Sequence, residues 1–144
     1  MPQLLRHTNA GWAVTEEADV AWLTLEDWQA GQPLLVSVDS EPDSSWLQAS
    51  AIAIEFPALT DGRGLSLAVL LRTRLRYEGD LVARGGVHED IAHFLARCGF
   101  DVIELPPGKD PHLALAWISP HSGYYQPSVS NSEPRFKGPD GLPA

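Results

Sequence analysis

Cysteine is almost absent from this chain of 144 residues, since Cys98 is the single one. One thiol excludes an internal disulfide framework and cannot ligate an iron–sulfur cluster. The chain also lacks an apolar run near the ~20 residues that a membrane-spanning helix needs, and its N-terminus shows no signal-peptide pattern. These absences predict a protein of the reducing cytoplasm with no membrane partner.

Basic residues are scarce as well. The chain has 10 Lys and Arg against 19 Asp and Glu, a net charge of -9. Residues 1–60 contain nine acids and only Arg6, whereas residues 61–109 contain seven acids and seven bases. This charge disfavours binding to nucleic acid and to anionic membranes. It allows docking on a basic protein partner, and it is equally typical of surface acids that keep a protein soluble.

Common cofactor and metal motifs are missing too. The glycines match neither the phosphate loop nor the dinucleotide fingerprint, so we predict no cofactor. His88 and His93 resemble a zinc protease motif, but their spacing of five would place them about 140° apart on a helix. We therefore predict no metal site. Cys98 continues an apolar helix seam, which favours a packing role over a reactive thiol.

What the sequence does contain, from residue 33 onward, is a regular alternation of short apolar strands and helices. This pattern predicts an α/β fold of repeated β-α units with a mainly parallel sheet, covered on both faces. It leaves open whether the sheet stays open or curls like half of a barrel. The expected strands are 34–38, 51–56, 81–84 and 102–105, and the expected helices are 43–50, 65–76, 88–98 and 110–118.

We predict a single domain over residues 1–126. Residues 1–31 form a small β-rich entry segment, with apolar pieces at 11–14 and 20–25, and residues 33–126 contain the βα repeats. A last short strand is expected at 123–126. Residues 127–144 are rich in Pro, Ser and Gly and are expected to be an extended tail. Among the helices, 88–98 has the clearest pattern, with Ile91, Phe94, Leu95 and Cys98 on one apolar seam.

Three loops should meet at the carboxyl edge of the parallel strands, where ligands of α/β proteins usually bind. They are residues 60–64, 85–89 and 106–109. Their cations and helix N-termini suit a small anion. The candidate catalytic residues are Asp61, Arg63 and His88. The candidate ligand-binding residues of these loops are Asp61, Gly62, Arg63, Gly64, Gly85, Gly86, His88 and Lys109.

The same residues also have a purely structural interpretation. Asp61 is well placed to cap the helix that follows it, and Arg63 could pair with an acid to hold the loop in shape. Ser66 lacks the second flanking glycine of a nucleophile elbow, so we interpret it as a helix-start serine. The residues alone therefore leave a ligand site and a structural loop as alternatives.

Several spaced motifs resemble those of a known family. They are Phe56-Pro57, Thr60-Asp61-Gly62-Arg63-Gly64, Leu70-Leu71-Arg72, Arg97-Cys98-Gly99-Phe100-Asp101 and Tyr124-Tyr125-Gln126. In this combination they resemble the bacterial family of uncharacterised proteins encoded beside the assimilatory sulfite reductase hemoprotein subunit. The resemblance covers roughly residues 33–127 and adds Gln126 to the ligand-binding candidates. The family usually has tyrosine at the position of Leu65 and aspartate at that of Gly86.

The resemblance implies a cytoplasmic protein with a role in sulfite reduction and sulfur assimilation. Our leading hypothesis is an accessory or binding protein whose strand-end rim binds a small anion or the sulfite reductase hemoprotein. The main alternative is a small enzyme, an oxidoreductase or acid–base enzyme, that uses Asp61 and Arg63 on a phosphorylated or sulfated metabolite. A third possibility is a structural scaffold without a ligand. The oligomeric state is not predicted.

Overall fold

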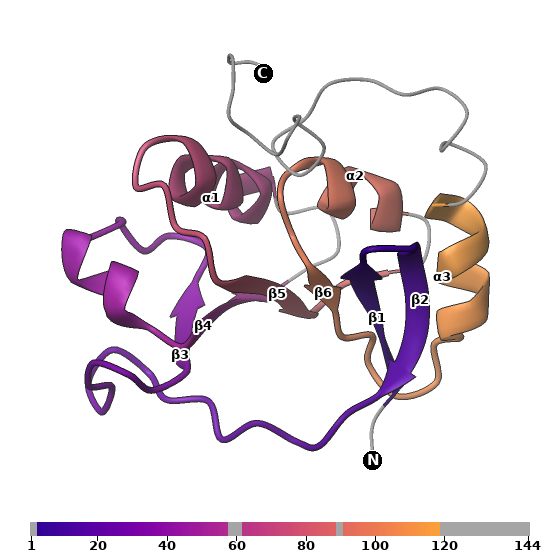
Figure 1. Cartoon of the computed structure of the whole chain (residues 1–144), viewed down its shortest axis with the longest axis horizontal. Coiled ribbons are helices and arrows are strands. Elements are labelled where there is room, and N and C mark those ends of the chain that lie inside the picture. The colour runs from indigo at the N-terminus through magenta and orange to yellow at the C-terminus, as the bar shows by residue number, and fades with distance from the viewer. Residues whose placement is uncertain (1–2, 58–61, 89–90, 119–144) are drawn as a thin grey trace.

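A six-stranded sheet in the order β2-β1-β6-β5-β4-β3 organises the protein (Figure 1). The computed structural model describes residues 3–57, 62–88 and 91–118, with only the backbone of residue 117. The strands are β1 (Gln3–Thr8), β2 (Gly11–Glu16), β3 (Leu34–Ser37), β4 (Ala51–Phe56), β5 (Asp80–Gly85) and β6 (Val102–Ile103). The helices are a 3-10 turn η1 (Ser44–Gln48), α1 (Gly62–Thr73), α2 (Ala92–Arg97) and α3 (Pro111–Ile118).

The predicted α/β class is confirmed. Strands β3, β4, β5 and β6 are parallel neighbours, whereas β1 pairs antiparallel with both β2 and β6. Each of the last three strands lies beside the one before it in sequence, so the chain advances across the sheet in one direction. Connections of this kind place successive crossover helices on the same face. The sheet is open, with β2 and β3 at its edges.

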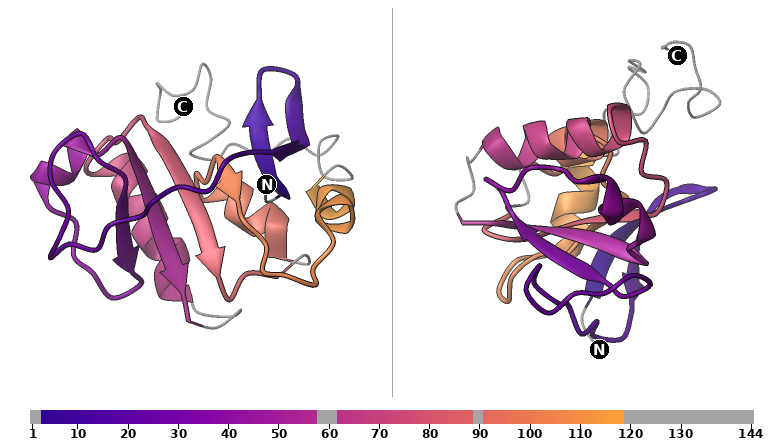
Figure 2. Two further views of the ribbon diagram at one scale, coloured as in Figure 1. Left: turned by 90° about the horizontal axis from the view of Figure 1, so that it is seen from below. Right: turned by 90° about the vertical axis from the view of Figure 1, so that its left-hand side faces the viewer.

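Both faces of the sheet are covered, as predicted, but by different elements. Alternate strand residues such as Ile52, Ile54, Leu81 and Ile103 point into the main core, which they share with α1 and α2. The other face carries a smaller buried cluster of Leu4, Ala53, Val82 and Val102, against which Trp22 and Leu35 pack. Figure 2 shows the helices on one side of the sheet and residues 17–33 crossing the other side without a helix.

Helix α1 runs three residues ahead of its predicted position. Its buried side chains Leu67, Ala68 and Leu71 form one stripe toward the core, so its burial is one-sided rather than many-sided. The chain then leaves the helix through Arg76, whose φ of 62° is left-handed. That conformation turns the backbone back toward β5 and ends the helix.

The N-terminal segment is β-rich, as predicted, but its strands differ from the expectation. The first strand of the hairpin, β1, was not predicted, and its partner β2 covers the expected piece 11–14. Residues 20–25 form no strand. There Leu23 makes one isolated bridge with Leu34. Of this piece, Trp22 packs against the buried cluster of the helix-free face, whereas Val20 and Leu25 are exposed, a division that propensity alone does not reveal.

Helix α2 is shorter than the predicted helix 88–98, and its seam is different. Leu95 and two alanines are its buried residues, while Phe94 is 48% exposed. Cys98 is half-buried against the core, and burial raises the pKa of its thiol. The predicted packing role of Cys98 is therefore confirmed. Because α2 begins after His88, the angular argument for separating His88 and His93 on one helix was wrong.

The remaining elements are close to the expectation. The side chain of Asp110 accepts a hydrogen bond from His112 N at 2.9 Å and so caps the N-terminus of α3. The predicted helix 43–50 is the shorter turn η1, and it buries Trp46. Strand β6 ends at Ile103 rather than at residue 105. The expected strand 123–126 and the tail lie outside the described residues. None of the helices in the described ranges is long and apolar enough to cross a membrane.

Candidate functional site

The carboxyl edge of the parallel strands is where the sequence predicts a site. Phe56 pairs with Gly85, so the loops that follow β4 and β5 leave the sheet side by side. Strand β6 lies next to β5, which brings the loop 106–109 to the same edge. We call these loops the strand-end rim. Two of the predicted site residues, Asp61 and Gln126, lie outside the described residues.

Two rim glycines are required by close packing. A Cβ atom on Gly64 would lie 2.3 Å from Cε2 of Phe56, so only glycine lets the first turn of α1 pack on that ring. Gly85 has a φ of +90°, and a Cβ there would lie 2.6 Å from the backbone oxygen of Phe56. The N–H of Gly86 donates to that same oxygen at 2.7 Å. Close packing thus explains the glycines at 64 and 85, and the Gly86 N–H ties the start of its loop to the end of β4.

The charged residues of the rim differ in exposure. Arg63 lies in the first turn of α1, next to Gly62, and its side chain is exposed. His88 and Lys109 are half-buried in the loops after β5 and β6. The topology therefore brings these three basic side chains to one edge of the sheet, at different depths. Of the three, Arg63 is the most exposed to solvent.

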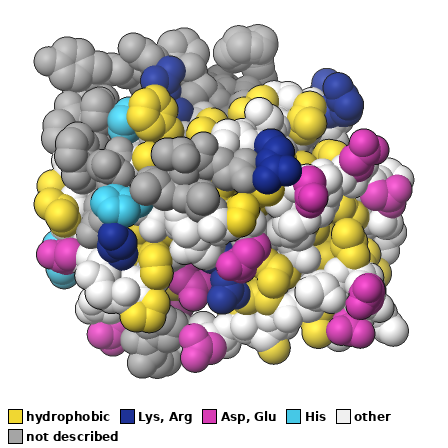
Figure 3. Space-filling model, turned by 180° about the vertical axis from the view of Figure 1, so that it is seen from behind, with side chains coloured by type: hydrophobic (Ala, Val, Ile, Leu, Met, Phe, Trp, Pro, Cys, Tyr) yellow, Lys and Arg dark blue, Asp and Glu magenta, His cyan; other side chains and the backbone are white. Residues whose placement is uncertain are grey.

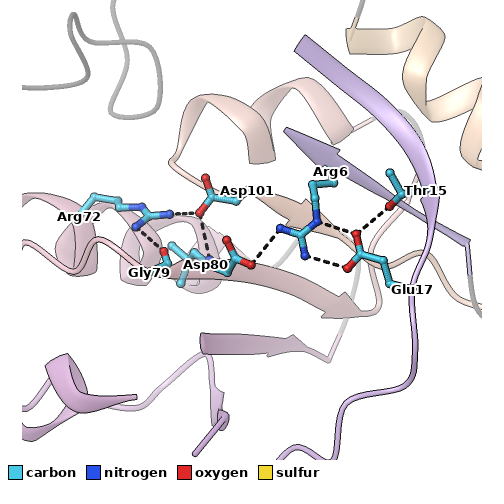
Figure 4. A network of polar contacts seen from close by, with 8 residues as sticks. Arg6, Thr15, Glu17, Arg72, Gly79, Asp80 and Asp101 are labelled. Atoms are coloured by element: carbon cyan, nitrogen blue, oxygen red, sulfur yellow. Dashed lines mark hydrogen bonds and ion pairs between the residues drawn. The ribbon is translucent and has the colours of Figure 1, made fainter. Parts of the chain in front are cut away.

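Arg72 has a structural role instead. Its guanidinium donates to the carbonyl oxygens of Tyr77 at 2.7 Å, Gly79 at 2.9 Å and Gly99 at 2.9 Å, and to the carboxylate of Asp101. Figure 4 shows the contacts with Gly79 and Asp101. Asp101 in turn accepts from the N–H of Leu81 at 3.1 Å. This network joins α1 to the starts of β5 and β6. All of its partners belong to the fold, so the motif containing Arg72 is explained without a ligand.

Tyr77 strengthens the same corner. Its ring is buried, and its hydroxyl donates to the carbonyl oxygen of Ala49 at 3.0 Å. Burial, opposed in part by the nearby Arg72, raises the pKa of Tyr77 to about 12. The hydroxyl therefore stays protonated at neutral pH and serves as a structural donor.

A second polar cluster lies on the helix-free side of the sheet. Arg6 donates to both carboxylate oxygens of Glu17, at 2.6 and 2.8 Å, and to Asp80 at 2.9 Å. Thr15 also donates to Glu17, at 2.9 Å. The hydrogen bond from Arg6 holds the pKa of Glu17 below its ordinary value. Figure 4 shows Arg6 between the two carboxylates, so it ties the start of segment 17–33 to the sheet.

A row of three charged side chains crosses the sheet near this cluster. Arg84 pairs with Glu55 in register across β4 and β5, and its Nε lies 3.5 Å from the Glu55 carboxylate and 3.8 Å from that of Glu104. All three side chains are partly exposed. At these separations the attraction is weaker than in the contacts that Arg6 makes.

Arg6 and Arg84 border a cleft of about 270 Å³ that lies between the sheet and the segment 17–33. We call it the sheet-face cleft. Its apolar lining comes from the smaller buried cluster and from Trp22. Its full lining consists of Leu4, Arg6, Glu17, Ala18, Asp19, Val20, Trp22, Ala51, Asp80, Val82, Arg84, Val102 and Glu104.

Comparison with known proteins places the chain in a family. The model of DUF934, a bacterial family of proteins of unknown function, matches residues 38–136. The chain belongs to the DUF934 family. No curated protein and no solved structure matches it. The matched range includes the strand-end rim and the Arg72 network, but it begins after β1, β2 and the segment that covers the sheet-face cleft.

The residues of the sheet-face cleft were not predicted as a site in this DUF934 protein. The acidic residues of the cleft entered the sequence analysis only through the overall charge. Arg6, the single base among residues 1–60, was the one local sign of an ion-pair cluster. Arg6 and Asp80 are 74 positions apart in sequence, and β1 reaches β6 only by antiparallel pairing that the pattern does not reveal. The spacing of motifs in the sequence predicts which loops follow successive strands. It does not predict which residues from distant strands lie side by side on one face of the sheet.

Proposed function

We propose that this DUF934 protein is an accessory binding protein of sulfite reduction, acting in the cytoplasm, and that its strand-end rim binds a small anion or the sulfite reductase hemoprotein. The link to sulfite reduction comes from the family resemblance of the spaced motifs around Asp61, Arg72 and Asp101. The observation that carries the binding site is the position of Arg63, exposed in the first turn of α1 at the strand-end rim.

Rim geometry supports a binding role in three ways. Gly64 beside Arg63 packs on Phe56, and the Gly86 N–H bonds to the Phe56 carbonyl oxygen, so these neighbours of Arg63 are fixed in place before a partner binds. An exposed guanidinium presents a planar set of donors that matches sulfite, sulfate, phosphate or a carboxylate. The first turn of a 12-residue helix adds a partial positive charge at the same place.

The test compares wild-type protein with Arg63→Ala. Thermal shift with sulfite, sulfate and phosphate measures anion binding, because a ligand of the folded state raises the melting temperature. Biolayer interferometry with purified sulfite reductase hemoprotein measures partner binding. Arg74→Ala is the matched control, since Arg74 is an exposed arginine just beyond the other end of α1.

We expect at least one of these ligands to bind wild type and Arg74→Ala, and to bind Arg63→Ala at least several-fold more weakly. Binding that is equal in all three proteins would refute the assignment of the rim. Absence of binding to the three anions and to the hemoprotein would refute the proposed function itself.

A further inference from the structure

We propose that the sheet-face cleft is a docking site for a basic side chain, arginine or lysine, of a protein partner. This inference goes beyond the proposed function, because Arg63 does not line the cleft. The cleft, at about 270 Å³, lies just below the usual range of small-molecule pockets, which starts near 300 Å³, and is suited to one long side chain rather than a cofactor.

The charge of the cleft is complementary to a cation. Its lining holds four carboxylates, those of Glu17, Asp19, Asp80 and Glu104, against the two guanidinium groups of Arg6 and Arg84. Arg6 is shared between two carboxylates, and one positive charge cannot neutralise both. The lining therefore keeps two net negative charges, and a third cation would reduce their repulsion.

Arg84 repeats this arrangement further along the cleft. It is shared between Glu104, which lines the cleft, and Glu55 just outside it. The chain as a whole has the same sign, with a net charge of -9. On the side of the molecule seen in Figure 3, acidic side chains are spread over the lower and right-hand parts, with a few basic side chains among and above them. Such a field steers a basic partner toward the cleft and repels an acidic one.

The apolar part of the cleft selects the kind of cation. Leu4, Val82 and Val102 provide a hydrocarbon floor, and the half-buried indole of Trp22 provides a wall. The methylene stem of arginine or lysine can lie on such a floor while its charged end meets the carboxylates. An indole ring also attracts a guanidinium or ammonium group. A metal ion fits less well, because no three metal-ligating side chains cluster in the described ranges.

The probe is the capped tripeptide acetyl-Gly-Arg-Gly-amide, titrated into ¹⁵N-labelled full chain and followed by NMR. Its matched control replaces arginine with citrulline, which has the same shape without the charge. We expect saturable shifts at millimolar peptide, concentrated on the Trp22 indole N–H and on the amides of Val82 and Val102. We expect the citrulline peptide to bind at least tenfold more weakly, and added salt to weaken the arginine peptide.

Protein variants test the assignment to the cleft. The double variant Asp19→Asn/Glu104→Gln should weaken binding of the arginine peptide several-fold, whereas Glu41→Gln, which removes a charge from an exposed residue outside the cleft, should leave it unchanged. Arg63→Ala should also leave it unchanged, which separates this test from that of the rim. Equal binding of both peptides, shifts scattered over the surface, or no saturable binding to folded protein would overturn the proposal.

Discussion

Replacement of Arg72 is expected to destabilise the protein more than replacement of any exposed arginine. The guanidinium is 10% exposed and the Asp101 side chain 16% exposed, so the pair is largely shielded from water. Arg72→Met keeps most of the hydrocarbon stem but removes every donor. Three carbonyl oxygens and one carboxylate then lose their main partner inside the protein.

The size of the effect follows from these contacts. Leaving one partner of a buried ion pair without the other costs about 3–5 kcal/mol. Residual exposure lets water reach the site, and Asp101 keeps its hydrogen bond from Leu81 N. We therefore expect a value at the lower end of this range, a loss of about 3 kcal/mol in the free energy of unfolding. For a chain of this size that corresponds to about 10 °C in melting temperature.

Urea unfolding followed by tryptophan fluorescence measures the change. The midpoint should fall while the slope stays the same, because the surface exposed on unfolding is unaltered. Arg74→Ala is the control and should change stability by less than about 0.5 kcal/mol. A double-mutant cycle with Asp101→Asn should give a coupling energy of about 1–3 kcal/mol. A loss below about 1 kcal/mol in Arg72→Met would refute the structural role and return Arg72 to the candidates for function.

Two further predictions concern the rim and the N-terminal cluster. Gly64→Ala should lower stability by about 1–3 kcal/mol in thermal unfolding, because its methyl group would clash with the ring of Phe56; an unchanged melting temperature would refute the packing argument. Glu17→Gln should lower stability by about 1 kcal/mol or less at neutral pH, by weakening the pair with Arg6. Since the folded-state pKa of Glu17 lies below its ordinary 4.5, this stabilisation is present above pH 4.5 and lost as the pH falls through the lower folded value. The melting temperatures of wild type and Glu17→Gln should therefore converge as the pH is lowered. A difference that stays constant with pH would contradict the lowered pKa of Glu17.

Local pattern was enough to identify the order of the described elements from residue 33 to residue 118. Strand β4 and helix α3 were predicted almost residue by residue, because a short apolar run and an Asp-Pro start are signals that neighbouring residues carry by themselves. Parallel pairing followed from the alternation of strands and helices. The common edge of the three rim loops followed from that pairing, without any knowledge of side-chain contacts.

Tertiary structure alone decided what the polar residues do. Arg72 was grouped with residues of a shared motif, but its four acceptors come from two separate stretches of the chain, residues 77–79 and 99–101. Gly64 suggested an approach to a ligand, yet the group that approaches it is Phe56. The sheet-face cleft depends on β1 crossing to β6 and on an irregular segment covering one face. Such contacts form between residues far apart in sequence, where hydrophobic periodicity carries no information about which partner is chosen.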